Sequence, residues 1–317
     1  MELFIFCVVL LSFPHDSKES GDWCYEPQVN CTDSHSCKGP MEWNEVESAC
    51  AGSKQSPVNI VTAKAKYNSS LKPFEFVYYS QSNTVTIKNN GHSAQITLNS
   101  SIKVSGGGLP TTYKAVQMHF HWGTSDVKEI GSEHTIDGER YPMELHIVHI
   151  KENFADLNEA IKEADGIAVL GFLYNESGSP NGNYDSLITS LSNITLEGNS
   201  TTINNFMLEK LIPSKENMAK YYRYSGSLTT PACNEAVVWT VFAEPIQLSK
   251  DQLQAFPNNL LYTNGKNMTE NYRPLQRLNG RTIQTSSSCI VASSSLLAAN
   301  GLFCSFLASV IIYTQFY

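Results

Sequence analysis

Three histidines on two alternating segments have the residue types and spacing of a metal site. Residues 117–122 read QMHFHW, and residues 144–149 read ELHIVH. Side chains of an extended strand alternate between two faces, so His119 and His121 point the same way. Together with His146 they bring three imidazoles from two strands. Three neutral nitrogen ligands leave a fourth tetrahedral position open for water, so the pattern predicts a catalytic Zn²⁺ site.

A mainly β domain must position these histidines. Alternating or β-branched runs separated by turn signals predict strands at 74–77, 84–87, 94–98, 115–122, 143–150, 167–174 and 236–242. Helical patterns are sparse, with candidates at 154–164, 186–191 and 249–256. Ser249 and Gln252 have the spacing of a capping box that would open the last of these helices. No linker or repeat interrupts the body of the chain, so we expect a single domain.

The charge balance excludes one class of partner. The 317 residues carry a formal net charge of -8, and no run of Lys or Arg occurs. Nucleic acid is bound by basic patches, so no nucleic-acid partner is expected.

An apolar run near the start indicates a signal peptide. Residues 3–13 form an apolar core of signal-peptide length, too short to span a bilayer comfortably. Glu2 stands where a positive charge is usual, and no clear A-x-A cleavage site follows, so a buried N-terminal strand is the alternative interpretation. We assign residues 1–20 to a signal peptide and residues 21–285 to the mature domain.

The other end of the chain has the features of a lipid-attachment signal. A Ser/Ala-rich spacer precedes an apolar tail, and no Lys or Arg follows residue 281. Small residues, a spacer and a terminal apolar run are typical of a GPI signal, which we assign to residues 286–317. The attachment residue is expected among Ser286, Ser287 and Ser288, with Ser287 preferred and the serines at 293–295 as a fallback. A transmembrane tail is the alternative.

Sequons and cysteines indicate the secretory pathway. A high density of Asn-x-Ser/Thr sequons suits a glycosylated chain. The expected glycosylation sites are Asn30, Asn68, Asn99, Asn175, Asn193, Asn199 and Asn267. Once the signal peptide and the tail are removed, five cysteines remain: Cys24, Cys31, Cys37, Cys50 and Cys233. Because five is odd, at least one cysteine is free or pairs between chains.

Four segments in sequence order resemble the signature segments of the α-class carbonic anhydrases. They are residues 119–123 (HFHWG), 131–135 (GSEHT), 144–149 (ELHIVH) and 226–231 (GSLTTP). The resemblance extends from about Trp23 to Arg281. It implies the family's α+β, mainly β fold, with a large twisted and mostly antiparallel central sheet and short peripheral helices. It also implies reversible hydration of CO2 to bicarbonate and a proton by zinc-bound hydroxide.

The resemblance assigns the ligands and the residues that orient them. It implies that Zn²⁺ is bound by His119, His121 and His146. The expected orienting groups are the side chains of Gln117 and Glu144 and the backbone carbonyl of Asn271. Such partners fix the tautomer and the ring angle of a ligand histidine.

Further residues match the family's catalytic positions. Thr229 is expected to accept a hydrogen bond from the zinc-bound hydroxide and to donate its own proton to Glu133. His92 matches the proton shuttle, and imidazole titrates in the range that this role requires. The residues expected to order waters between His92 and zinc are Tyr25, Asn90 and Gln95. His134 and His149 receive no role.

An apolar wall is expected to receive CO2, which is small and uncharged. The residues that match the family's substrate pocket are Val148, Val169, Leu228, Thr229, Thr230, Val237 and Trp239.

The cysteines indicate a branch of the family. Cys50–Cys233 resembles the inter-loop disulfide of secreted and membrane-associated members. Residues 23–26 (WCYE), with a further cysteine near 37, resemble the GPI-anchored, type IV-like members and imply a Cys24–Cys37 bridge; Cys31 stays unassigned. The enzyme is then expected on the extracellular face of the plasma membrane, with bicarbonate transporters as functional partners.

Two other functions compete with CO2 hydration. A catalytically silent ectodomain used for binding or adhesion would have lost at least one ligand, whereas all three histidines are present. A zinc esterase would use the same hydroxide, but the small apolar pocket favours CO2.

Overall fold

The computed structural model describes residues 23–29, 37–126 and 130–287. Its longer strands are β3 (Phe74–Val77), β4 (Asn83–Asn89), β5 (Ala94–Thr97), β6 (Lys103–Gly106), β7 (Tyr113–Trp122), β10 (Met143–Lys151), β11 (Ile167–Ser177), β12 (Ser200–Phe206), β13 (Tyr221–Gly226) and β14 (Val237–Ser249). The two-residue strands are β1 (Asn59–Ile60), β2 (Lys66–Tyr67), β8 (Thr135–Ile136), β9 (Glu139–Arg140) and β15 (Gln284–Thr285). The α-helices are α1 (Trp43–Val46), α2 (Leu157–Ala160), α3 (Asp185–Leu191) and α4 (Lys250–Asn259).

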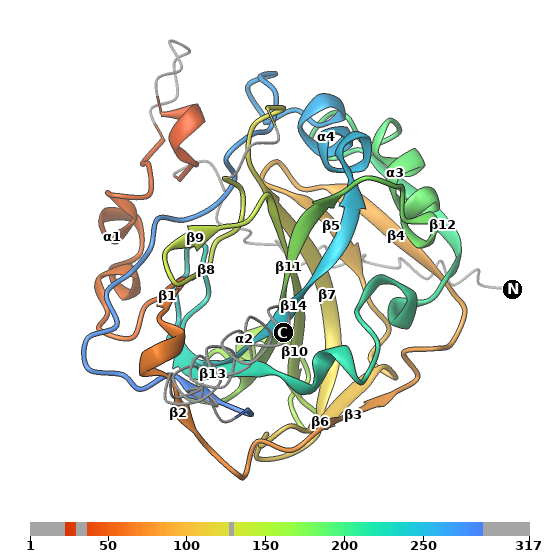
Figure 1. Ribbon diagram of the computed structural model, residues 1–317. Helices are drawn as coiled ribbons and strands as arrows, with labels where there is room; N and C mark the ends of the chain where they lie inside the picture. The colour runs from red at the N-terminus through yellow and green to blue at the C-terminus, as the bar shows by residue number, and fades with distance from the viewer. Residues whose placement is uncertain (1–22, 30–36, 127–129, 288–317) are drawn as a thin grey trace, which may run out of the picture.

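Within the described residues, twelve strands form one large sheet, and β1, β8 and β9 form a small one (Figure 1). The order of the large sheet is β12-β4-β5-β7-β10-β11-β14-β13-β15-β2, and β3 is attached through β6, which pairs with β7. The β11–β14 and β15–β2 pairs are parallel and the other pairs of this sheet are antiparallel. The expected mainly β fold with a mostly antiparallel central sheet is confirmed.

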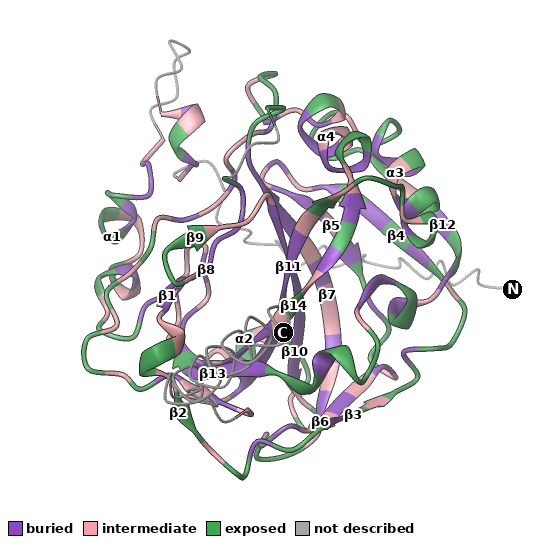
Figure 2. Ribbon diagram, in the orientation of Figure 1, coloured by how far each residue is buried: buried purple, intermediate pink, exposed green. Residues whose placement is uncertain are grey.

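The two faces of the central strands carry different side chains. On β10, Leu145 and Ile147 pack in the larger apolar core, whereas Val148 belongs to a second apolar cluster. On β7, Met118 and Phe120 likewise face the larger core. The intervening histidines therefore lie on the opposite face, as the period of two requires. Figure 2 shows that these strands are mostly buried at the centre of the molecule.

The helices lie at the periphery, and one expected helix is much shorter than the sequence pattern indicates. The capping box of α4 is confirmed: Ser249 Oγ accepts from Gln252 N, and Gln252 Oε1 accepts from Ser249 N. The helix expected over 154–164 is reduced to the single turn of α2. The chain folds back on itself there, and a Cβ at Gly166 would lie 1.9 Å from the carbonyl oxygen of Ala160. That close approach ends the helix before β11 begins.

Several sequence-based assignments fall outside the described residues. They are the signal peptide (1–20), the glycosylation site at Asn30, the unassigned Cys31 and the chain beyond Ser287. In the ranges that the structure does describe, no helix combines the length and the apolar character needed to cross a membrane.

Candidate metal centre

Strand register brings the three histidines together. His146 of β10 lies directly opposite His119 of β7, and Glu144 lies opposite His121. On the next strand, Gly171 lies opposite His146. A Cβ at this glycine would lie 3.2 Å from Glu144 Oε1 and press on the carboxylate. The three imidazole centroids are 4.6 to 5.2 Å apart, so one sheet face supplies a compact cluster.

Each imidazole is fixed by a hydrogen bond on its outer nitrogen. His119 Nδ1 lies 2.9 Å from Gln117 Oε1, and His121 Nδ1 lies 2.7 Å from the carbonyl oxygen of Asn271. His146 Nε2 lies 2.8 Å from a carboxylate oxygen of Glu144. These oxygens accept hydrogen bonds, so the outer nitrogens carry the protons. The inner nitrogens are left with lone pairs that face a common point.

The inner nitrogens of the three histidines are placed to bind a metal ion rather than to hydrogen-bond with one another. His121 Nε2 and His146 Nδ1 are 3.1 Å apart, and the inner atoms of all three histidines lie within 4.8 Å of one another. Burial lowers the pKa of His119 well below its usual value and also lowers that of His121, with each further reduced by neighbouring histidines. Neutral imidazoles with converging lone pairs are suitable ligands for Zn²⁺.

Glu144 forms the centre of a hydrogen-bond network beneath the cluster. Its Oε1 accepts from His146 Nε2 and from His134 Nδ1 at 2.7 Å, while its Oε2 accepts from the backbone N–H groups of Glu133 and His134, both at 2.8 Å. Burial alone would raise the pKa of Glu144, but the two imidazoles and their hydrogen bonds hold it well below its usual value. The ionised carboxylate thereby fixes the His146 ring.

His134 is part of this network, a role that sequence reasoning missed. The ring is fully buried, and its Nε2 lies 2.6 Å from the hydroxyl of Tyr224. His134, Glu144 and His146 also lie close enough to form a second possible metal-binding group. Their nitrogen–oxygen distances of 2.7 and 2.8 Å are those of hydrogen bonds, because both nitrogens donate to one oxygen. His149, by contrast, is a core histidine. It follows the β-bulge after Val148, and its Nε2 is hydrogen-bonded to the hydroxyl of Tyr79.

Glu133 lies next to the ligand nitrogens. Its Oε1 accepts from the backbone N–H of Arg273 at 2.8 Å, and its Oε2, although buried, has no hydrogen-bond partner. Oε2 lies 3.6 Å from His121 Nε2 and 3.9 Å from His146 Nδ1. Within the described residues, no hydrogen bond joins Glu133 to Thr229. A bound cation and its solvent would supply partners for this buried, unpaired carboxylate oxygen and for the three histidine lone pairs beside it.

A cavity of about 250 Å³ opens over His119 and His146. The expected substrate-pocket residues that line it are Val148, Val169, Leu228, Thr229, Thr230 and Trp239. Val237 is not among the lining residues; its side chain is fully buried in the adjacent apolar cluster, opposite Ile167 in the sheet. Residues that sequence reasoning missed complete the wall: Leu157, Asn158, Ile161, Pro231, Ala232 and Asn234. The segment around α2 therefore covers one side of the cavity.

His92 lies apart from this cluster, in a turn whose backbone is held by Asn90. Asn90 Oδ1 accepts from the backbone N–H of His92 at 3.0 Å, and Asn90 Nδ2 donates to Gln95 Oε1 at 3.2 Å. The His92 ring stacks on Trp23, with centroids 3.9 Å apart and planes 14° apart. Its Nδ1 is buried without a hydrogen-bond partner, and burial lowers the pKa of His92 to about 4. Tyr25 is also buried and meets the ring edge-on at 6.2 Å.

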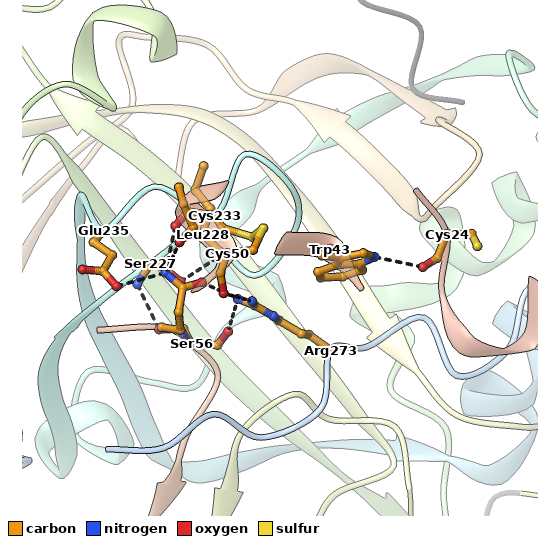
Figure 3. The surroundings of a disulfide bond; sticks show 11 residues. Cys24, Trp43, Cys50, Ser56, Ser227, Leu228, Cys233, Glu235 and Arg273 are labelled. Carbon is orange, nitrogen blue, oxygen red and sulfur yellow. Dashed lines mark hydrogen bonds between the residues drawn. A yellow bond between two sulfur atoms is a disulfide. The ribbon is translucent and has the colours of Figure 1, made fainter. Parts of the chain in front are cut away.

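One disulfide closes a loop within the N-terminal segment and a second ties that segment to the rest of the domain. The structure contains both the Cys24–Cys37 and the Cys50–Cys233 bridges. Cys24 accepts a hydrogen bond at its carbonyl from the indole of Trp43 (Figure 3). Trp43 packs edge-on against Trp23. Cys233 follows the loop that carries Thr229 and Thr230. The first bridge therefore helps to place Trp23 beside His92, and the second anchors the loop over the cavity.

The sequons differ in accessibility. Asn99, Asn193, Asn199 and Asn267 are exposed. Asn68 and Asn175 are half-buried, and the Asn68 amide donates to Gln284 Oε1 at 2.9 Å. Ser287 is the last described residue, and its backbone N–H donates to Thr285 Oγ1.

Comparison with known proteins identifies the family. The family model of eukaryotic-type carbonic anhydrases matches residues 38–287. The chain is 47% identical to carbonic anhydrase 4 of Oryctolagus cuniculus, over 82% of this chain and 83% of that protein. It is 41% identical to carbonic anhydrase 4 of Rattus norvegicus, over 89% and 90%. It is 37% identical to carbonic anhydrase 12 of Homo sapiens, over 81% and 75%. The chain belongs to the eukaryotic-type carbonic anhydrases.

Proposed function

We propose that this protein interconverts CO2 and bicarbonate, releasing or taking up a proton, at a Zn²⁺ site formed by His119, His121 and His146. The observation that carries the proposal is the convergence of three inner imidazole nitrogens whose outer nitrogens are all hydrogen-bonded. Zinc, when bound, lowers the pKa of water and so supplies a nucleophile at neutral pH, an effect for which the carbonic anhydrases themselves are the standard example.

Glu133 and Thr229 would control the orientation of a hydroxyl group at the site. The buried, unpaired Oε2 of Glu133 can accept a hydrogen bond from a hydroxyl and cannot donate one when the carboxyl is ionised. We propose that it accepts a hydrogen bond from the hydroxyl of Thr229, which leaves the lone pairs of Thr229 Oγ1 free to accept a hydrogen bond from the nucleophile. The backbone N–H of Arg273 fixes Glu133 from the opposite side.

The cavity wall would select an uncharged substrate. Val148, Val169, Leu228 and Trp239 form an apolar side next to the two accessible ligand histidines. CO2 has no charge to desolvate and no proton to donate, so it can bind against such a wall at little cost in free energy. Bicarbonate, in contrast, would leave a negative charge against apolar groups and is favoured to return to water.

His92 would carry the proton between the site and buffer. Asn90, Gln95 and Tyr25 surround the turn that bears the ring, and we assign them to ordering waters along the path. A ring with a pKa of about 4 holds almost no proton at neutral pH. We therefore infer that the ring leaves its stack on Trp23, and gains water, when it accepts a proton.

Stopped-flow measurement of CO2 hydration tests the main proposal. Zinc-loaded protein should accelerate hydration, a chelator should abolish the acceleration, and added Zn²⁺ should restore it. A folded, zinc-binding protein without activity would instead support the silent ectodomain. An ester substrate measured in parallel would show whether hydrolysis is more than a side reaction.

We also propose that the enzyme acts on the extracellular face of the plasma membrane, held by a GPI lipid at Ser287. The spacer and apolar tail of residues 286–317, the sequons and the two disulfides support this location. Bicarbonate transporters are the proposed functional partners. Phosphatidylinositol-specific phospholipase C should release the protein from intact cells, whereas a transmembrane tail would leave it bound. Replacing Ser287 should shift or prevent attachment.

A further inference from the structure

A second cavity lies away from the candidate metal centre. It has a volume of about 410 Å³, compared with about 250 Å³ over the histidines, and it shares no lining residue with that cavity. Its walls come from the segment around α1 and Cys50 and from residues 273–279. No Asp or Glu side chain lines it, whereas Arg273 and Arg277 both do. Its volume lies within the usual range for small-molecule sites.

Arg273 lines this cavity, and its guanidinium carbon lies 5.4 Å from the centroid of the Trp43 ring. Its side chain is 2% exposed. Nη1 donates to Gln55 Oε1 at 2.7 Å and to the carbonyl of Ser56 at 3.0 Å, and Nη2 donates to the carbonyl of Cys50 at 3.2 Å (Figure 3). All three acceptors are neutral, and the buried Nε has no partner. A buried cation with an unused donor favours an anion nearby.

The nearest carboxylates do not neutralise this charge by direct contact. Among the described residues, no Asp or Glu forms an ion pair with Arg273. Glu133 accepts from the backbone of Arg273, not from its guanidinium. Glu235 accepts from the Gln55 amide nitrogen, so the Gln55 side chain separates it from Arg273. The guanidinium therefore keeps capacity for an anionic ligand.

The outer part of the cavity combines a second cation with exposed apolar groups. Arg277 is exposed, and its guanidinium forms no ion pair with any of the described residues. Met41 is 80% exposed and Leu275 is 40% exposed, and both line the cavity. Two large exposed apolar side chains beside a cation give this recess the chemistry to bind an amphipathic ligand.

We propose that this cavity binds a small amphipathic carboxylate, with its head group between Arg273 and Arg277 and its apolar chain against Met41 and Leu275. The site uses none of the metal-ligand histidines and is independent of the proposed function. A free small molecule is favoured over a polypeptide because the volume of the recess is that of a small-molecule site.

Calorimetric titration of the zinc-loaded protein with octanoate tests this proposal. Arg277→Glu should weaken binding about tenfold or more, since it replaces a charge-assisted contact with a repulsive one. Lys215→Glu is the matched control. It changes the charge by the same amount, and Lys215 is exposed and does not line the cavity. Leu275→Asp should also weaken binding, and octylamine, which lacks the carboxylate, should not bind.

A second variant separates this site from the metal centre. Leu228→Trp fills the cavity over the histidines and should leave octanoate binding intact. The ε-methyl NMR signal of Met41 should shift on titration in the parent protein and in Leu228→Trp, but not in Arg277→Glu. Binding that is lost in Leu228→Trp, equal in Arg277→Glu and Lys215→Glu, or absent from the parent protein would overturn the proposal. Arg273 is left unchanged because its buried guanidinium makes three hydrogen bonds that hold the segment whose backbone N–H positions Glu133.

Discussion

The histidines of the candidate metal centre and His92 differ in how they are held. Every imidazole of the cluster has an outer nitrogen paired with an oxygen, at 2.9 Å for His119, 2.7 Å for His121 and 2.8 Å for His146. The ring of His92 is held by stacking on Trp23, and its buried Nδ1 has no partner. The rings of the candidate metal centre are fixed by hydrogen bonds, whereas the His92 ring is held by stacking alone.

This difference matches the demands of the two proposed tasks. A metal ligand must keep one tautomer and one angle, so its partners add affinity by fixing both. A proton carrier must exchange between the site and solvent, and a strong hydrogen bond in one position would slow that exchange. Changes in the first region should therefore abolish activity, while changes in the second should alter its rate and its pH dependence.

The largest effect is expected from His119→Ala. The substitution removes one of three ligands, so zinc content and CO2 hydration should both fall to background, as measured by atomic absorption and stopped-flow. His149→Gln provides a control, because His149 is a buried histidine of β10 that contacts Tyr79 and not the cluster. Full activity in a metal-free His119→Ala protein would contradict the metal assignment.

A smaller loss is expected from Glu144→Gln. The carboxylate accepts four hydrogen bonds, whereas an amide would turn an NH2 group toward N–H donors. Zinc affinity should fall about 10–100-fold, and the free energy of unfolding should fall by roughly 1–3 kcal/mol. Chelator competition and thermal unfolding measure the two effects. Gln117→Ala removes one accepted bond at a half-buried position and should cost less; the reverse order would argue against Glu144 as the centre of the network.

The parts of this molecule that could be predicted from sequence have a strict local period. On β7 the alternation of side chains places His119 and His121 on one face, whatever the rest of the fold does. The capping box at Ser249 is local in the same sense, since its two hydrogen bonds span three residues. Such features need no knowledge of distant contacts.

The features that sequence reasoning missed depend on contacts between distant segments. β12 (Ser200–Phe206) is rich in Ser, Thr and Asn and lacks an apolar alternation, because it is an edge strand that, among the described strands, pairs only with β4. His134 acquires its place from Glu144 and Tyr224, which lie 10 and 90 residues away. The stack of Trp23 on His92 likewise joins residues on separate segments. No local pattern encodes these contacts.

His92→Ala tests the less constrained region. Turnover in dilute buffer should fall, but by less than the ~10²-fold that a positioned acid or base commonly contributes, because buffer takes over part of the transfer. Zinc content should stay unchanged, which separates this effect from that of His119→Ala. Added imidazole should restore part of the rate. A rate that does not change at any buffer concentration would mean that protons leave by another route.

The smallest and most specific effect is expected from Trp23→Ala, which removes the ring that covers His92. The pKa of His92, lowered by burial to about 4, should rise toward its ordinary value of 6.5, as followed by NMR titration of the ring. In the parent protein the unfolded chain binds a proton at this position between pH 6.5 and about 4 and the folded chain does not, so stability falls as the pH is lowered through that window. The variant should lose this part of the pH dependence.

Tyr25→Phe keeps the stack and removes only a hydroxyl, so it should leave the His92 pKa near 4. An unchanged pKa in Trp23→Ala would show that burial by Trp23 does not set the proton affinity of His92. Release of the His92 ring from Trp23 would then have no role in proton transfer.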